Sequence, residues 1–280
     1  MSNQARFPRQ FSFEFSAPRT PEDGDKIGRV HNRLRQLNPG FFSVTYGAGG
    51  STREGTREAV LEINAAGSVV APHLSFGGDP PEKIEALLAE YKAAGIKRVV
   101  ALRGDVPSGT GSKSLRYANE LVAFIREKTG DHFHIEVAAY PEIHPDSVSA
   151  QSDLEYFKLK VDAGADSALT QYFYNADAYF WYVDACEKMG VDIPIVPGIM
   201  PITNFAALVR FSNKCSAEIP RWIKRHLESY EGDVESQKAF GEAVVTDLCR
   251  RLLDGGAPGL HFYTLNQSLP TLRVWRNLGL

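Results

Sequence analysis

A single carboxylate stands among aromatic residues near the start of the chain, in the run Phe11-Ser12-Phe13-Glu14-Phe15-Ser16. A carboxylate buried without a partner loses several kcal/mol of solvation or shifts its pKa upward until it is neutral, so such a position usually serves chemistry. Glu14 is therefore a candidate catalytic acid. In the alternative interpretation the run is an edge strand, in which Glu14 faces water and the phenylalanines face the core.

Other polar groups follow short apolar runs. Arg103-Gly104-Asp105 follows the apolar residues 99–102, and its glycine lets a flat ligand approach the backbone between two opposite charges. An ordinary ion pair at a loop entry is the alternative. The ends of the other apolar runs carry Glu14, Thr45, Tyr46, His73, Tyr140, Glu142, His144, Gln171 and Asn266.

Several familiar motifs are incomplete. The glycine-rich segment 47–52 lacks the last glycine of a dinucleotide fingerprint and the acidic residue about twenty positions further on. The segment 108–114 lacks the GxxxxGK spacing of a phosphate loop. His132 and His134 lie two apart with no third ligand at a useful spacing, so no metal site is predicted.

The composition is that of one sizeable globular protein. The 280 residues are 43% hydrophobic and 23% charged, which suffices for a continuous core. The net charge of −3, with lysines and arginines scattered along the chain, argues against nucleic acid or an anionic membrane as a partner. Cys186, Cys215 and Cys249 lie far apart, which indicates a reducing compartment. With neither a signal peptide nor a membrane span in the sequence, we expect a cytoplasmic protein.

Short β-rich runs alternate with amphipathic helical segments along the whole chain, which is typical of βα units around a parallel sheet. Eight such units in about 250 residues predict a single (β/α)8 barrel, a TIM barrel, over residues 1–280. A doubly wound open sheet is the alternative, but it needs a switch point that the sequence does not show. The expected strands are residues 11–16, 41–46, 68–75, 98–103, 134–140, 167–173, 193–199 and 260–265.

The segment between the last two expected strands breaks this rhythm. It has room for two helices, and residues 215–232, which include Trp222, are expected as a helical insertion after strand seven. In a barrel of this class the reactive groups stand at the carboxyl ends of the strands. Glu14 and the other strand-end groups would then share one face.

A series of collinear motifs between residues 11 and 266 closely resembles the methylenetetrahydrofolate reductase family. Among them are Phe13-Glu14-Phe15, Ser43-Val44-Thr45-Tyr46-Gly47-Ala48, Ala101-Leu102-Arg103-Gly104-Asp105, Ala139-Tyr140-Pro141-Glu142, Thr170-Gln171 and His261-Phe262-Tyr263-Thr264-Leu265-Asn266. The resemblance implies an FAD-dependent barrel that reduces 5,10-methylenetetrahydrofolate to 5-methyltetrahydrofolate with NAD(P)H, by ping-pong hydride transfer through the flavin. Its product would supply methyl groups for methionine synthesis.

The resemblance also implies roles for single residues. Glu14 matches the general acid that protonates the folate, and Asp105 matches a carboxylate near both flavin and pterin. Gln171 and Phe205 match residues that bind the folate, as do Glu14 and Asp105. The residues that match FAD-binding positions are Thr45, His73, Arg103, Gly104, Asp105, Tyr117, Ala118, Tyr140, His144, Asp153 and Lys160.

The chain departs from the family pattern in a few places. Gln267 stands where the family often has an arginine suited to the folate tail, and Tyr156 and Leu159 replace polar flavin contacts of some relatives. The chain ends at Leu280, so no C-terminal regulatory domain and no inhibition by adenosylmethionine are expected. The choice between NADH and NADPH and the oligomeric state are left open, with a homo-oligomer favoured by analogy alone.

Two other functions are compatible with the residues taken by themselves. One is a cofactor-free barrel lyase or hydrolase that holds a phosphorylated substrate on Arg103, and the other is a barrel that has lost its activity. A yellow preparation would favour the flavoenzyme over the lyase. Intact Glu14, Asp105 and Gln171 speak against lost activity.

Overall fold

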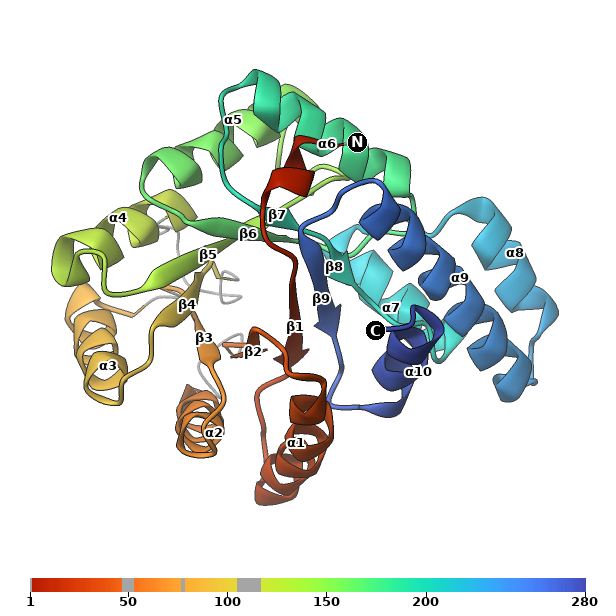
Figure 1. Ribbon diagram of the computed structural model, residues 1–280, viewed down its shortest axis with the longest axis horizontal. Coiled ribbons are helices and arrows are strands. Elements are labelled where there is room, and N and C mark those ends of the chain that lie inside the picture. Colours follow the sequence, from red (N-terminus) through yellow and green to blue (C-terminus); the bar gives the residue numbers. More distant parts are fainter. Residues whose placement is uncertain (1, 47–52, 77–78, 105–116) are drawn as a thin grey trace. The chain divides into compact units, whose positions relative to one another are not determined.

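The computed structural model describes residues 2–46, 53–76, 79–104 and 117–280. Strands and helices alternate along these residues in the predicted order (Figure 1). Asp105 and the segments 47–52 and 108–114 lie outside the described residues. The strands are β1 (Gln10–Phe15), β2 (Phe41–Val44), β3 (Val70–Leu74), β4 (Arg98–Ala101), β5 (His134–Ala139), β6 (Ser167–Thr170), β7 (Ile195–Val196), β8 (Gly198–Ile199) and β9 (Gly259–Tyr263).

The helices between these strands carry most of the remaining described residues. They are η1 (Asn3–Arg6), α1 (Pro21–Leu34), η2 (Arg35–Leu37), α2 (Arg53–Ala65), α3 (Pro81–Ala93), α4 (Ala118–Thr129), α5 (Ala150–Asp162), α6 (Ala176–Lys188), α7 (Phe205–Cys215), α8 (Arg221–Ser229), α9 (Val234–Asp254) and α10 (Leu269–Asn277). Local signals start them: Thr20 accepts a hydrogen bond from the Asp23 N–H before α1, and Pro21 occupies the first turn.

The strands follow one another in the order β7-β6-β5-β4-β3-β2-β1-β9-β8, and every pair with a defined register is parallel. Glu14 lies opposite Ser43 in this register, and Gly198 lies opposite His261. Parallel pairing brings the carboxyl ends of neighbouring strands to the same edge. This parallel βα alternation is the architecture that the sequence predicts.

The seventh expected strand, residues 193–199, is divided into β7 and β8. Pro197 lies between them and has no N–H for a strand ladder, although its carbonyl accepts a hydrogen bond from the His261 N–H at 3.0 Å. Gly198 follows, and a Cβ built there would lie 2.1 Å from the Thr170 carbonyl oxygen. The number of strands is nine instead of eight because one expected strand is interrupted at Pro197, so β7 and β8 belong to the same βα unit.

Several strands end earlier than the sequence predicts. β2 ends at Val44, β4 at Ala101 and β6 at Thr170, two or three residues before the expected boundaries. Apolar character continues past the strand in one such case, because Tyr172 and Phe173 are buried although they follow β6. Because these loop residues are buried, their sequence has the same aromatic character as the strand, and the sequence alone does not show where the strand ends.

The expected insertion at residues 215–232 contains α8. Ile223 and Leu227 are buried, and the His226 ring stacks on the Phe240 ring of α9 at 5.0 Å between centroids. Trp222 packs edge-on against the same ring at 6.0 Å. The insertion is thus a helix that rests its apolar side on α9.

The chain forms two compact units. Unit 1 consists of Met1–Phe11, Ala139–Tyr156 and Leu169–Leu280, and unit 2 consists of Ser12–Ala138 and Phe157–Ala168. In unit 2 the buried rings of Phe15 and Phe42 stack at 5.5 Å, and in unit 1 those of Phe173 and Tyr179 stack at 5.9 Å. Each fully buried aromatic side chain contributes about 2–3 kcal/mol of hydrophobic free energy.

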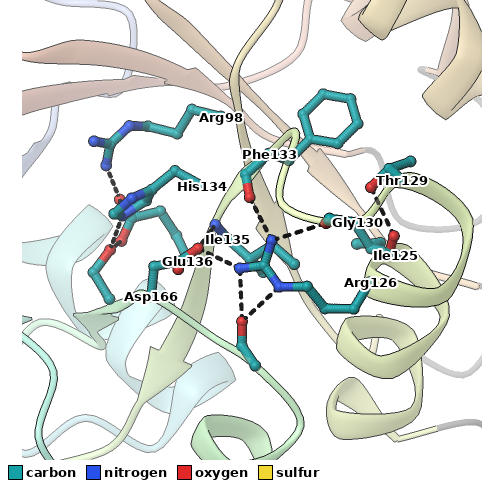
Figure 2. Close-up of polar contacts among 12 residues, drawn as sticks. Arg98, Ile125, Arg126, Thr129, Gly130, Phe133, His134, Ile135, Glu136 and Asp166 are labelled. Carbon is teal, nitrogen blue, oxygen red and sulfur yellow. Dashed lines mark hydrogen bonds and ion pairs between the residues drawn. The ribbon is translucent and has the colours of Figure 1, made fainter.

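A polar network lies at the amino ends of β4, β5 and β6, within unit 2 (Figure 2). The Glu136 carboxylate is 1% exposed, forms an ion pair with Arg98 and accepts a hydrogen bond from the Ser167 hydroxyl. His134 Nε2 lies 2.7 Å from that hydroxyl, and burial lowers the pKa of His134. Every member of this group therefore has a partner inside the group.

The Arg126 guanidinium of α4 extends the network (Figure 2). It donates hydrogen bonds to the carbonyl oxygens of Phe133 at 2.7 Å and of Gly164 at 2.8 and 3.0 Å. It also pairs with Asp166 at 2.6 Å, and the same Asp166 oxygen accepts the Ile135 N–H at 2.6 Å. One side chain thus joins the segments that precede β5 and β6.

Candidate active site

Glu14 lies one residue before the carboxyl end of β1 and faces His73 of β3. Its Oε2 is 3.3 Å from His73 Nε2, and the two side chains are only 14% and 8% exposed. Phe13 and Phe15, which flank it in the alternating strand, are fully buried. The interpretation that Glu14 faces water is therefore wrong.

The His73 ring carries an unusual polar atom. Its Nε2 is buried and, among the described residues, has no hydrogen-bond partner, because the contact with Glu14 is close but not aligned for a hydrogen bond. A buried nitrogen without a hydrogen bond costs about 1–3 kcal/mol. A polar ligand at the carboxyl end of β1 and β3 would remove this cost, so the position fits ligand binding.

Thr45 shapes the neighbouring loop after β2. Its Oγ1 accepts the Ala17 N–H at 3.0 Å, its own N–H donates to the Phe15 carbonyl oxygen at 2.9 Å, and its carbonyl oxygen accepts the Thr56 hydroxyl at 2.8 Å. These bonds hold Phe15 and Ala17, one and three residues after Glu14, where the chain leaves β1. Thr45 and Glu14 thus belong to the same edge of unit 2.

Arg103 and Gly104 follow β4 at that edge. The Leu102 N–H still donates to the Leu74 carbonyl oxygen at 2.9 Å, so the backbone leaves the sheet only afterwards. Gly104 adopts a φ of 81°, a left-handed conformation that favours glycine. Arg103 is half-buried, whereas the next predicted residue, Asp105, lies outside the described residues.

Three further predicted FAD residues of unit 2 have clear local roles. Tyr117 caps α4 through its backbone N–H, which donates to Glu120 Oε2 at 2.6 Å, and its side chain is exposed. Ala118 is the first residue of that helix. Lys160 Nζ donates to the Ala138 carbonyl oxygen at 2.5 Å.

Unit 1 carries the other predicted FAD residues around the loop after β5. The Tyr140 and His144 rings meet edge to face at 4.5 Å, and His144 Nδ1 accepts the Asp146 N–H at 3.0 Å. Asp153 in α5 is buried and accepts the Ser147 hydroxyl at 2.9 Å. The structure thus groups these three residues on one loop and the helix that follows it.

Gln171 and Phe205, the predicted folate residues, also belong to unit 1. The Gln171 N–H donates to the Ala139 carbonyl oxygen at 2.8 Å, which holds the chain beside β5 as it leaves β6. Phe205 begins α7, where Asn204 caps the helix by accepting the Ala207 N–H at 2.8 Å. The cap therefore fixes the backbone at Phe205, the first residue of the helix.

Two structural partners of these residues were missed from the sequence. The buried Gln237 of α9 accepts the Phe205 N–H at 3.2 Å, and nothing in the sequence marks a polar residue so far along the chain. The Tyr263 hydroxyl donates to the Thr170 carbonyl oxygen at 2.6 Å, while Thr170 Oγ1 accepts the Gly198 N–H at 2.9 Å. Tyr263 belongs to one of the family motifs, but that motif does not indicate that its hydroxyl bonds to Thr170.

Unit 1 also contains a group of partly buried polar side chains. Burial raises the pKa of Glu142 to about 6, opposed by a hydrogen bond from the Glu218 N–H at 2.8 Å. Burial also raises the pKa of Tyr172, whose hydroxyl lies 3.0 Å from Ser212 Oγ and 3.4 Å from Cys215 Sγ. Among the strand-end groups of this unit, Glu142 is thus one that exchanges its proton near neutral pH.

The described groups support proton transfer and anion binding. Unit 2 brings the Glu14 carboxyl and the His73 imidazole together at one strand edge, and Arg103 follows the neighbouring β4, which suits a general acid and an anionic ligand. Within the described ranges, no three His, Cys, Asp or Glu side chains gather as metal ligands. Among the helices of the same residues, none is long and apolar enough to cross a membrane.

Comparisons with known proteins point to one family. A family model described as methylenetetrahydrofolate reductase matches residues 3–279. The 5,10-methylenetetrahydrofolate reductase of Escherichia coli (strain K12) is 38% identical over 96% of this chain and 90% of its own. That of Buchnera aphidicola is 41% identical over 97% and 92% of the two chains. A relative from Arabidopsis thaliana named methylenetetrahydrofolate reductase (NADH) 1 is 39% identical over 96% of this chain and 48% of its own.

A solved structure shares the fold. It is a protein from Clostridium thermocellum whose description states that it binds two copies of 5-methyl-5,6,7,8-tetrahydrofolic acid. The TM-score is 0.71, and the match covers 98% of this chain and 96% of the other, at 13% identity. The likeness confirms the predicted TIM-barrel class.

Proposed function

Because the chain belongs to the methylenetetrahydrofolate reductase family, we propose that it reduces 5,10-methylenetetrahydrofolate to 5-methyltetrahydrofolate with NAD(P)H, in two half-reactions that share a bound FAD. The NADH in the name of the Arabidopsis relative supports a nicotinamide donor. The tetrahydrofolate named for the solved fold neighbour supports the folate substrate. The product would serve methionine synthesis.

The pair of Glu14 and His73 is the observation that carries this proposal. Reductive opening of the folate's five-membered ring requires a proton at the departing nitrogen, and a positioned acid accelerates such a step by about 10²–10⁴. Glu14 is shielded from water, and its Oε2 stands 3.3 Å from an imidazole nitrogen. We assign the proton donation to Glu14, whose carboxyl group lies beside the His73 ring.

The chain's own residues fit a flavin. Bound FAD would supply hydride chemistry by accepting a hydride from the nicotinamide and giving it to the folate. The buried Nε2 of His73 needs a hydrogen-bond partner, and the Arg103 guanidinium suits a pyrophosphate. The proposed FAD site consists of Thr45, His73, Arg103, Gly104, Asp105, Tyr117, Ala118, Tyr140, His144, Asp153 and Lys160.

The folate would contact a second set of residues. We assign Gln171 and Asp105 to the pterin and the Phe205 ring to stacking on the substrate. Gln237 acts as a positioning residue, because it holds the backbone N–H at the start of α7. Its effect on the folate would pass through the direction of the Phe205 ring.

Anaerobic mixing tests the proposed function. Purified protein should be yellow, or become so with added FAD, and NADH should bleach the flavin absorbance. Methylenetetrahydrofolate added afterwards should restore it, with 5-methyltetrahydrofolate as the product. A colourless protein that FAD cannot reconstitute would contradict the proposal and favour the cofactor-free lyase, and a reduced flavin that folate cannot reoxidise would contradict the folate half-reaction.

A further inference from the structure

Glu14 shares one face of the sheet of unit 2 with Ser43, its neighbour on β2. The two residues are partners in the parallel register of β1 and β2, and successive side chains of a strand point to opposite faces. The other face is identified by its aromatic contacts, since the Phe42 ring packs on Phe13 at 5.8 Å and stacks on Phe15 at 5.5 Å between centroids. Ser43, which follows Phe42 along β2, therefore points to the same side as Glu14.

The contact between Glu14 and His73 passes over β2 at this place. β2 lies between β1 and β3, so the two side chains approach from either side of it and come within 3.3 Å of each other. Ser43 is opposite Glu14 in β1 and opposite Ala71 in β3, two residues before His73. Because neighbouring strands lie only about 4.8 Å apart, rotation of its side chain brings the Ser43 hydroxyl within reach of the Glu14 carboxyl group.

The Ser43 hydroxyl has no hydrogen bond among the described residues, although the residue is 0% exposed. Thr45, the next residue that points to the same face, differs, because its Oγ1 already accepts the Ala17 N–H at 3.0 Å. An apolar side chain in place of an unpaired buried hydroxyl is neutral or stabilising. A serine at this position therefore requires an explanation other than stability.

We propose that Ser43 is a positioning residue for the acid step, whose hydroxyl donates a hydrogen bond to the Glu14 carboxylate that forms when Glu14 protonates the folate. The inference rests on the proposed reductase function and deepens it. Proton transfer breaks the O–H bond of the Glu14 carboxyl group and leaves one negative charge there, while Ser43 keeps its own proton throughout. The hydroxyl is thus a donor already in place for a charge that develops only during the transfer.

A donor at this place favours the products of the proton transfer over the reactants. A hydrogen bond to an ionised group is about twice as strong as one between neutral groups, so Ser43 stabilises Glu14 more as a carboxylate than as a neutral acid. Part of this difference is present in the transition state, where the charge develops, and only such a difference accelerates the step. Flavin reduction by NADH does not use the Glu14 proton, so Ser43 should act on the folate half-reaction alone.

Separate anaerobic half-reactions of the FAD-loaded Ser43→Ala protein test this inference. Reoxidation by methylenetetrahydrofolate should be about tenfold slower than in the wild type, whereas reduction by NADH and FAD affinity should not change. In the Glu14→Gln background the same substitution should have no further effect, because the carboxylate that Ser43 stabilises does not form. Thr271→Val is the matched control: it also removes a buried hydroxyl that has no hydrogen bond among the described residues, but from α10, and it should alter neither half-reaction.

Urea unfolding distinguishes this role from a structural one. The midpoint of Ser43→Ala should equal or exceed that of the wild type, as should that of Thr271→Val. A lower midpoint for Ser43→Ala, equal reoxidation rates in this variant and the wild type, or a further loss of rate in the Glu14→Gln background would overturn the inference. Weaker FAD binding would assign the hydroxyl to His73 instead. A wild-type flavin that the folate cannot reoxidise would reject the proposed function and the inference with it, so the two failures can be told apart.

Discussion

Buried polar groups at the amino ends of the strands of unit 2 differ from those at the carboxyl ends in their hydrogen bonding. At the amino ends, Glu136 is bonded to Arg98 and Ser167, so the partners of each charge come from the protein itself (Figure 2). At the carboxyl ends, His73 Nε2 is equally buried, yet it has no hydrogen bond among the described residues and only a close contact with Glu14. A network in which every polar group is hydrogen-bonded stabilises the fold, whereas a buried polar group without a hydrogen bond indicates a position where a ligand binds.

The largest expected effect on stability comes from Glu136→Gln. The change leaves the Arg98 guanidinium, 14% exposed, without its carboxylate, and such a loss costs about 3 kcal/mol or more. Urea unfolding followed by circular dichroism measures it, with the exposed Glu187→Gln as the control. The half-reactions of the folded variant should keep their wild-type rates. A change below about 0.5 kcal/mol would mean that this edge does not hold the fold.

Arg126→Met should have the next largest effect. Methionine keeps an unbranched apolar side chain, but the carbonyl oxygens of Phe133 and Gly164 lose their donor, at a cost of about 2 kcal/mol in unfolding free energy. Thermal and urea unfolding of this variant, beside the exposed Arg276→Met, measure the cost. Equal stability of the two variants would contradict the role assigned to Arg126.

His73→Leu should change stability in the opposite direction. Replacing a buried nitrogen that has no hydrogen bond by an apolar side chain should stabilise the FAD-free protein by about 1 kcal/mol. FAD binding, followed by flavin fluorescence, should weaken about tenfold because the ligand loses its partner. A loss of stability with unchanged FAD affinity would mean that His73 stabilises the fold and does not bind the ligand.

Glu142→Gln in unit 1 should give the smallest effect, and one that depends on pH. The pKa of Glu142 is raised by burial from an ordinary 4.5 to about 6, so its contribution to stability is full below pH 4.5 and is lost as pH rises through about 6. The variant should match the wild type near pH 4 and exceed it by about 1 kcal/mol at pH 8, after discounting for partial exposure. Urea unfolding across this pH range measures the difference, and a constant difference would contradict it.

The sequence predicts the succession of βα units better than it predicts the ends of the individual strands. Hydrophobic periodicity locates every βα unit, because it is a local property. The carboxyl ends of strands are misplaced where buried side chains such as Tyr172 continue past the sheet. The split at Pro197 depends on the approach of Thr170 to Gly198, a contact that only the fold creates.

The candidate site follows the same rule. Glu14 and His73 were each predicted from a strand end and a family motif, but their 3.3 Å contact depends on the pairing of β1, β2 and β3. Gln237 could not be predicted at all, since it acts through a backbone N–H of a distant helix. Arg126 likewise looks like any charged residue on an exposed helix face until the segment before β6 returns to it.

The proton donation assigned to Glu14 is tested most directly by Glu14→Gln in separate anaerobic half-reactions. Glutamine keeps the shape of the side chain and removes the proton. NADH should reduce the flavin of the variant at the wild-type rate, whereas methylenetetrahydrofolate should reoxidise it at least about a hundredfold more slowly. Reoxidation at the full rate would contradict the assignment of Glu14 as the acid.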